Sequence, residues 1–132
     1  IYDDSARLKA IDEHITTIEK SMKQITELSE NPSADMNQIV RWVNNKDSYA
    51  DELSDILTYY FMAQRIKPAA EGAAERAAYI RRLTLLHEML VTSMKCKQTL
   101  DLTHVQTLRT LLKDFSSAYL HSADDHEEHT HD

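Results

Sequence analysis

The sequence has little of what turns, crosslinks and sheets require. Its 132 residues include one glycine, two prolines and one cysteine. So few turn-forming residues exclude a turn-rich β fold. The lone cysteine, Cys96, cannot form a disulfide within the chain. The fold therefore does not depend on an oxidising compartment.

Charge and hydropathy exclude two classes of partner. The formal net charge is -7, so the chain lacks the basic excess that displaces counterions from a nucleic acid. Its apolar runs are short and interrupted by charged residues, and no segment is expected to span a bilayer. We therefore expect neither a nucleic acid nor a membrane as a partner.

Residues that favour helices dominate the composition, and apolar residues make up 42% of the chain. In four segments, apolar positions recur at steps of three and four residues, which indicates a helix with one buried face. The four expected stripes are Leu8, Ile11, Ile15, Ile18, Met22 and Ile25; Ile39, Val43, Lys46, Ala50, Leu53, Leu57 and Tyr60; Ile80, Leu83, His87, Leu90 and Met94; and Val105, Leu108, Leu112, Phe115 and Tyr119.

Three short connections separate these stripes, at 29–33, 67–73 and 98–103. The second contains Pro68, which cannot continue a helix, and the only glycine, Gly72. Short connections favour antiparallel neighbours, so residues 1–120 are predicted to form an all-α, up-and-down four-helix bundle. Residues 121–132 are polar and acidic without apolar periodicity, and we expect them to form a disordered tail.

Four of the seven histidines lie in this tail, at His121, His126, His129 and His131. A weak site for Ni²⁺, Zn²⁺ or Cu²⁺ at His126, His129 and His131 is one interpretation. A solvated terminus is the more common outcome for such a tract, and we favour it. The only Glu-x-x-His pair also lies here, which argues against a di-iron bundle. No zinc-binding motif is present.

Three polar or reactive residues fall within the helical segments. Lys46 lies on the second stripe. We expect its aliphatic chain to pack along apolar surface and its amine to reach solvent. The alternative is that Lys46 belongs to a polar pocket or an inter-subunit contact. His87, on the third stripe, is expected to be partly buried and hydrogen-bonded. Together with Arg82 it also fits, weakly, a helical ribonuclease. Cys96 is expected to be a small packing residue rather than a nucleophile.

In chain order, several stretches resemble nickel superoxide dismutase. They are IYDD at 1–4, HITTIEKSM at 14–22, QIVRWV at 38–43, YFMAQRIKP at 60–68, and 83–99 with LLHEMLV at 85–91. The resemblance extends over almost the whole chain to about Tyr119 and leaves out the histidine-rich tail. It implies dismutation of superoxide to oxygen and hydrogen peroxide by a nickel-dependent enzyme, a homohexamer of four-helix bundles and a cytoplasmic setting.

In this family, nickel is held by an N-terminal hook, His-Cys-x-x-Pro-Cys-Gly, which is followed by a short apolar residue and a tyrosine. The sequence opens at the equivalent of those two residues, Ile1 and Tyr2. The resemblance therefore places the hook ahead of Ile1, in a segment that is processed, truncated or disordered. No ligand for the catalytic nickel is expected in the chain as given, which would be inactive without the hook.

Three residues carry over from the family. Tyr2 matches the tyrosine that lines the substrate channel, where its phenol can donate a hydrogen bond to a bound anion. Asp3 matches the acid that follows it, which would cap the first helix or orient the hook. Arg41 matches a basic residue of the second helix that would draw superoxide toward the site. The alternative function is a hookless, non-catalytic bundle that serves as an oligomeric or metal-handling module.

Overall fold

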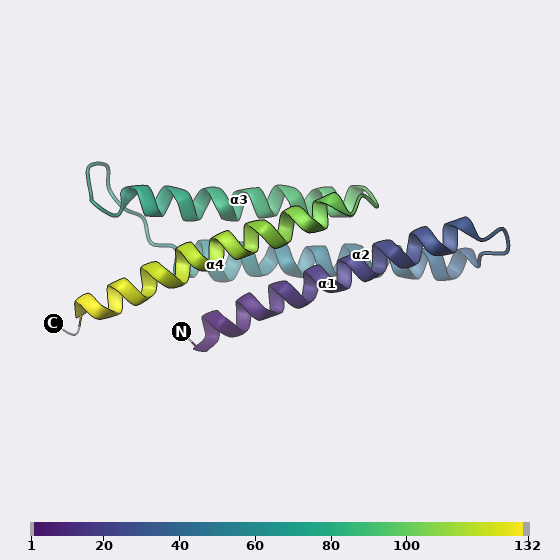
Figure 1. The fold of residues 1–132 in the computed structure, drawn as a ribbon, viewed down its shortest axis with the longest axis horizontal. Helices are drawn as coiled ribbons and strands as arrows, with labels where there is room; N and C mark the ends of the chain where they lie inside the picture. The colour runs from purple at the N-terminus through teal and green to yellow at the C-terminus, as the bar shows by residue number, and fades with distance from the viewer. Residues whose placement is uncertain (1, 131–132) are drawn as a thin grey trace.

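A computed structural model describes the backbone of residues 2–130 and the side chains of residues 3–121. It contains helices α1 (Tyr2–Glu30), α2 (Met36–Asp55), α3 (Arg76–Gln98) and α4 (Thr103–Thr130), and a π-helical segment, η1 (Ile56–Arg65) (Figure 1). No strand occurs within residues 2–130. None of the helices described is long and apolar enough to cross a membrane.

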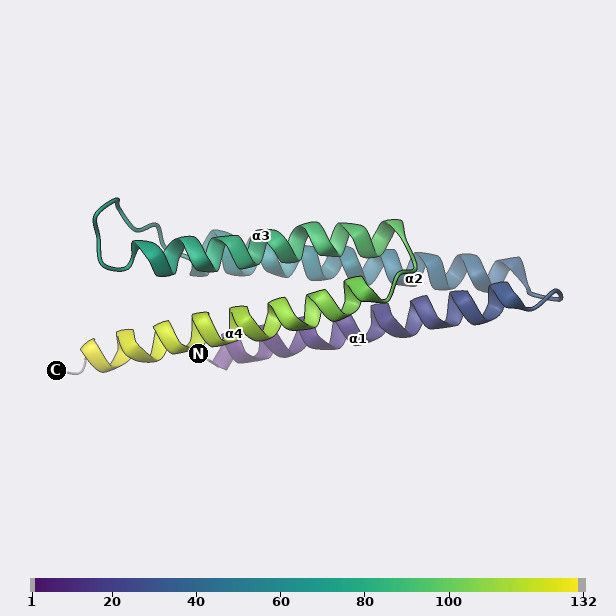
Figure 2. The ribbon, with the colours of Figure 1, turned by 45° about the horizontal axis from the view of Figure 1, so that its top comes forward.

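Successive helices pack antiparallel, which confirms the predicted four-helix bundle (Figure 2). α1 packs on α2 and α4, and α3 packs on the same two helices from the other side. The α1–α2 hairpin extends beyond the ends of α3 and α4 in both views (Figures 1 and 2). At its loop end, the α1–α2 hairpin is therefore not packed against α3 or α4.

Individual capping and turn residues mark where the helices begin and end. Asp35 precedes α2, and its Oδ1 accepts a hydrogen bond from the backbone N–H of Asn37 at 2.9 Å, as an N-cap does. The connection between η1 and α3 contains Pro68 and Gly72, and Gly72 has a φ of 82°, which favours glycine. α2 runs into η1 without a break, so these two elements form one long rod.

Three of the four predicted stripes face the core. The first is buried from Leu8 to Ile25, the centre of the second is buried from Lys46 to Leu57, and the fourth is buried throughout. Phe61 and Phe115 contact edge to face with ring centroids 5.2 Å apart, and Tyr119 stacks on Phe115. These aromatic contacts join η1 to α4 at the end of the bundle that contains the start of α1.

The predicted third stripe is wrong. Ile80 and Met94 are 47% and 52% exposed, and His87 is also exposed, so it is not the partly buried histidine that we expected. The residues of α3 that face the core are instead Leu85, Leu86, Met89, Thr92, Ser93 and Cys96. α3 is apolar on two faces, and its outward face happens to have the more regular spacing.

The expectation for Lys46 is also wrong. Its side chain is 2% exposed and does not reach solvent. Its Nζ donates to the backbone oxygens of Cys96 at 2.6 Å and Lys97 at 2.7 Å, and lies 3.2 Å from Asp47 Oδ1. The amine thus satisfies carbonyl groups in the last turn of α3, where a positive charge is favoured.

α4 continues to Thr130, past the point at which a separate tail was predicted. The side chains of 122–132 lie outside the described residues. The prediction that 121–132 behave as a separate, disordered tail stays a prediction.

Candidate functional site at the start of helix α1

A buried carboxylate organises the first turn of α1. Asp4 is 6% exposed and accepts hydrogen bonds from three side chains. Its Oδ1 accepts from Tyr60 Oη at 2.5 Å and from Arg65 Nε at 3.0 Å. Its Oδ2 accepts from Tyr119 Oη at 2.7 Å. These four residues, here called the Asp4 cluster, join α1, η1 and α4.

The π-helical geometry of η1 brings two of these donors together. In this segment a backbone N–H bonds to the carbonyl five residues earlier, as Ile66 does to Phe61 at 3.0 Å. Tyr60 and Arg65 are also five residues apart. The guanidinium of Arg65 lies 4.8 Å from the centre of the Tyr60 ring, and its Nη2 donates to Tyr60 Oη at 3.3 Å. One turn of η1 therefore presents both donors to the same carboxylate.

A second guanidinium, that of Arg7, lies 5.0 Å from the Tyr60 ring centre. Arg7 comes from α1, one turn after Asp4. Tyr60 is therefore contacted by two cations, one from its own segment and one from the helix that it anchors. Cation–π contacts of this kind help to hold the guanidinium groups of Arg7 and Arg65 against the Tyr60 ring.

Electrostatics keeps Asp4 ionised and its phenol partners protonated. Burial raises the pKa of Asp4, but the hydrogen bonds from Tyr60, Tyr119 and Arg65 outweigh it, so the pKa lies below its ordinary value. The pKa values of Tyr119 and Tyr60 are raised, first by burial and then by the neighbouring carboxylate. At neutral pH the cluster is a carboxylate held by charged and neutral donors.

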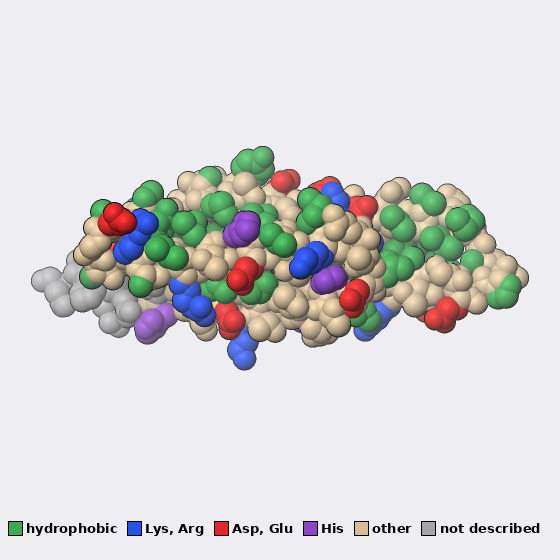
Figure 3. Space-filling view, turned by 90° about the horizontal axis from the view of Figure 1, so that it is seen from above, with side chains coloured by type: hydrophobic (Ala, Val, Ile, Leu, Met, Phe, Trp, Pro, Cys, Tyr) green, Lys and Arg blue, Asp and Glu red, His purple; other side chains and the backbone are tan. Residues whose placement is uncertain are grey.

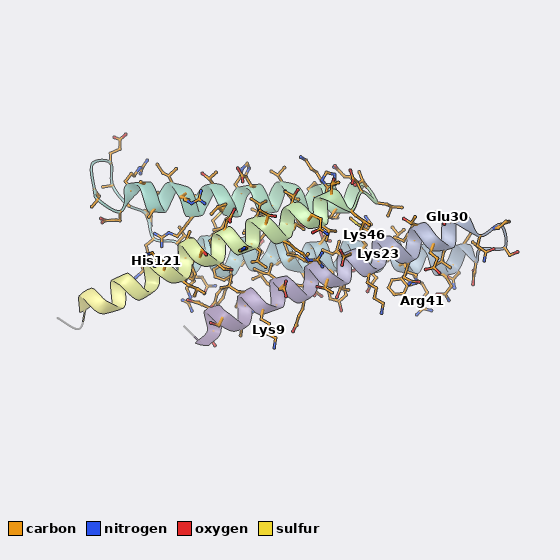
Figure 4. All side chains as sticks on the ribbon, in the orientation of Figure 1. Lys9, Lys23, Glu30, Arg41, Lys46 and His121 are labelled. Carbon is orange, nitrogen blue, oxygen red and sulfur yellow. The ribbon has the colours of Figure 1, made fainter. Side chains whose placement is uncertain are left out.

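Of the three residues predicted from the family resemblance, two have described side chains, and these two lie far apart (Figure 4). Asp3 is exposed, in the same turn as Asp4. The side chain of Tyr2 lies outside the described residues. Arg41 is exposed toward the loop end of the α1–α2 hairpin, far from the start of α1 (Figure 4). The roles predicted for these three residues stay predictions.

No nickel site can be assembled from the residues described. Among them, no three His, Cys, Asp or Glu side chains are grouped so as to hold a metal ion. Cys96 is fully buried, and burial raises the pKa of its thiol to about 11, although nearby Lys46 lowers it. It is therefore a thiol and not a thiolate ligand, as the packing role predicted for it requires. His126, His129 and His131 lie outside the described side chains.

Arg82 and His87 do not form a catalytic pair. Arg82 Nε donates to the carbonyl oxygen of Ala78 in its own helix at 3.3 Å. His87 lies on the exposed face of α3, beside a surface pocket of about 280 Å³ between α3 and α4. This arrangement offers no support for a ribonuclease.

Sequence reasoning missed the Asp4 cluster. It treated Tyr60 and Tyr119 as positions of an apolar stripe and identified no partner for Asp4. A signal was present, because a tyrosine on a core stripe usually needs a partner for its hydroxyl. The partner itself was not visible, because Asp4 is 115 positions from Tyr119.

Comparison with known proteins agrees with the family resemblance. The family model for nickel-containing superoxide dismutase matches residues 1–123. The chain belongs to this family. No curated protein and no solved structure matches it. The match includes both the start of α1 and the elements that bind Asp4, so the cluster lies within the part of the chain that this superoxide dismutase family shares.

Proposed function

We propose that this chain is the helical body of a nickel-dependent subunit that dismutates superoxide to oxygen and hydrogen peroxide. The family match over residues 1–123 carries this proposal. The described residues offer no set of metal donors, so the ligands are assigned to a hook ahead of Ile1. A cytoplasmic location is part of the same proposal.

The chain contributes the support for that hook. Three donors from two other elements fix Asp4, so the first turn of α1 has one position relative to the bundle. Tyr2 and Asp3 precede Asp4 in this turn. We assign Tyr2 the role of donating a hydrogen bond to superoxide and Asp3 that of orienting the hook. Arg41 would act on the anion through its field or from a neighbouring subunit.

We also propose that the chain assembles into the homohexamer that the family resemblance implies, and an exposed apolar face supports self-association. Figure 3 shows hydrophobic side chains along the face that α3 presents. Ile80, Val91 and Met94 are exposed there, with Leu83 and Leu90 partly buried beside them. We name these five residues the outer α3 stripe. An apolar stripe of this kind on a single chain is typical of a protein interface.

Restoring the hook tests the proposed function. The chain is produced with a hook of the family pattern directly ahead of Ile1 and with its histidine as the first residue. We expect about one nickel per chain and catalytic consumption of superoxide. The matched control carries serine in place of both hook cysteines and should lose nickel and activity. A hooked chain that binds nickel stoichiometrically but shows no dismutase activity would contradict the proposal.

The second candidate is a non-catalytic, metal-handling bundle. It is favoured by the concentration of histidines after position 120, where four of seven occur. Equilibrium Ni²⁺ binding to the full chain and to a chain lacking 121–132 separates the two functions. Stoichiometric binding that requires this segment, together with an inactive hooked chain, would favour the second candidate.

A further inference from the structure

A surface pocket on α2 lies far from the start of α1. Gln38, Arg41, Trp42 and Asn45 line this open pocket, whose volume is about 260 Å³. Their spacing of three, four and seven residues places them on one face of the helix. The pocket is smaller than those that hold drug-sized ligands, so its size suits a small molecule with a single ring.

Two cationic side chains lie close to Trp42 in this part of the surface. Lys20 Nζ, from α1, lies 5.8 Å from the centre of the Trp42 ring. Neither Lys20 nor Arg41 forms an ion pair with any carboxylate among the side chains that the structure describes, whereas Arg65 and Arg109 both do. Two cations without an ion pair therefore lie at this tryptophan, Lys20 over its ring and Arg41 in the lining of the same pocket, in a chain of net charge -7.

Polar groups in the pocket are partly pre-positioned. Asn45 Nδ2 donates to Ser21 Oγ at 3.0 Å, and Ser21 Oγ donates to the carbonyl oxygen of Thr17 at 2.9 Å. These bonds fix the orientation of the Asn45 amide at one side of the pocket. The guanidinium of Arg41 is exposed and can present two parallel N–H groups to an oxyanion.

We propose that Arg41, Trp42 and Lys20 form a binding site for a small organic anion, namely a flat ring that carries a phosphate or carboxylate. The ring stacks on the half-buried Trp42 side chain, where aromatic faces pair favourably. The oxyanion pairs with Arg41, and Lys20 contributes its charge from the facing helix. This binding does not require the hook, although it uses Arg41, to which the proposed function also assigns the guidance of superoxide.

Trp42 is the only tryptophan in the chain, so its fluorescence reports on this pocket alone. The full 132-residue chain is titrated with phenyl phosphate, with inorganic phosphate and with benzyl alcohol. We expect phenyl phosphate to change the emission saturably. Each of the other two probes lacks half of the recognised group, and we expect each to bind about tenfold more weakly or less.

Three variants locate the binding. Arg41→Gln should weaken phenyl phosphate binding about tenfold or more, and Lys20→Gln should weaken it less. Arg81→Gln is the matched control, because Arg81 is an exposed arginine on α3 that takes no part in the pocket. Circular dichroism checks that each variant is folded. If Arg41→Gln does not fold, the affinity of Lys20→Gln for phenyl phosphate tests the proposed site instead. Equal binding of benzyl alcohol, or unchanged affinity in the folded pocket variants, would overturn the proposal.

Discussion

Tyr119 Oη donates a hydrogen bond of 2.7 Å to Asp4 Oδ2, which joins α4 to the first turn of α1 across 115 positions of sequence. Asp4 is also held by Tyr60 and Arg65 from η1. The start of the chain, where a family member would carry its metal hook, is thereby tied to two other elements. The Asp4 cluster has one consequence for stability and another for pH dependence.

Replacing Tyr119 with phenylalanine should destabilise the bundle. The substitution keeps the stacked ring but leaves a buried carboxylate oxygen without its donor, which costs about 1–3 kcal/mol. Urea unfolding at neutral pH measures the loss. Tyr59→Phe is the matched control, because Tyr59 is 65% exposed and should change the unfolding free energy by less than about 0.5 kcal/mol. Equal effects of the two substitutions would refute a special role for the Tyr119 hydroxyl.

The stability that the Asp4 carboxylate contributes should disappear in acid. Burial raises its pKa, but the bonds from Tyr60, Tyr119 and Arg65 bring it below the ordinary 3.8 in the folded protein. The contribution is therefore complete above the unfolded pKa and is lost as the pH falls through the folded pKa. We expect the stability difference between the natural chain and Asp4→Asn to shrink below about pH 4.

Urea unfolding over a series of pH values measures this change. Asp3→Asn, which removes the exposed neighbouring carboxylate, should give a smaller difference with less dependence on pH. A difference for Asp4→Asn that stays constant from neutral to acid pH would rule out ionisation of Asp4 as its source.

Replacing Lys46 with methionine should destabilise the protein through α3. The new side chain has a similar length but leaves the carbonyl oxygens of Cys96 and Lys97 without their donor. We expect a loss of about 1–3 kcal/mol. Hydrogen exchange should also rise in the last turn of α3. Lys9→Met is the control, because Lys9 is exposed on α1 (Figure 4); an equal loss there would show that the amine of Lys46 is not the cause.

The outer α3 stripe should govern self-association. Val91→Glu and Met94→Glu each place a charge on this apolar face without touching the core, so we expect a smaller assembly at equal concentration. Sedimentation velocity measures the change in mass. Thr110→Glu, at an exposed position of α4, is the control. If the stripe variants keep the mass of the natural protein, another surface forms the interface.

The sequence by itself determined that this is a helical bundle and which family it belongs to. Those signals are local or additive: apolar spacing from Ile11 to Met22 needs no knowledge of other helices, Pro68 stops a helix wherever it lies, and short motifs in order identify the family. The charge of -7 likewise argued against a nucleic-acid partner without reference to the fold.

Only the tertiary structure decided which face of α3 is buried and what Lys46 and Asp4 contact. α3 has apolar residues on two faces, and its neighbours α2 and α4 select the one that contains Leu86 and Met89. Lys46 is buried because α3 ends opposite the middle of α2. These outcomes depend on contacts between residues far apart in the chain. They could not be predicted from the sequence, because the periodicity of apolar residues describes one helix at a time.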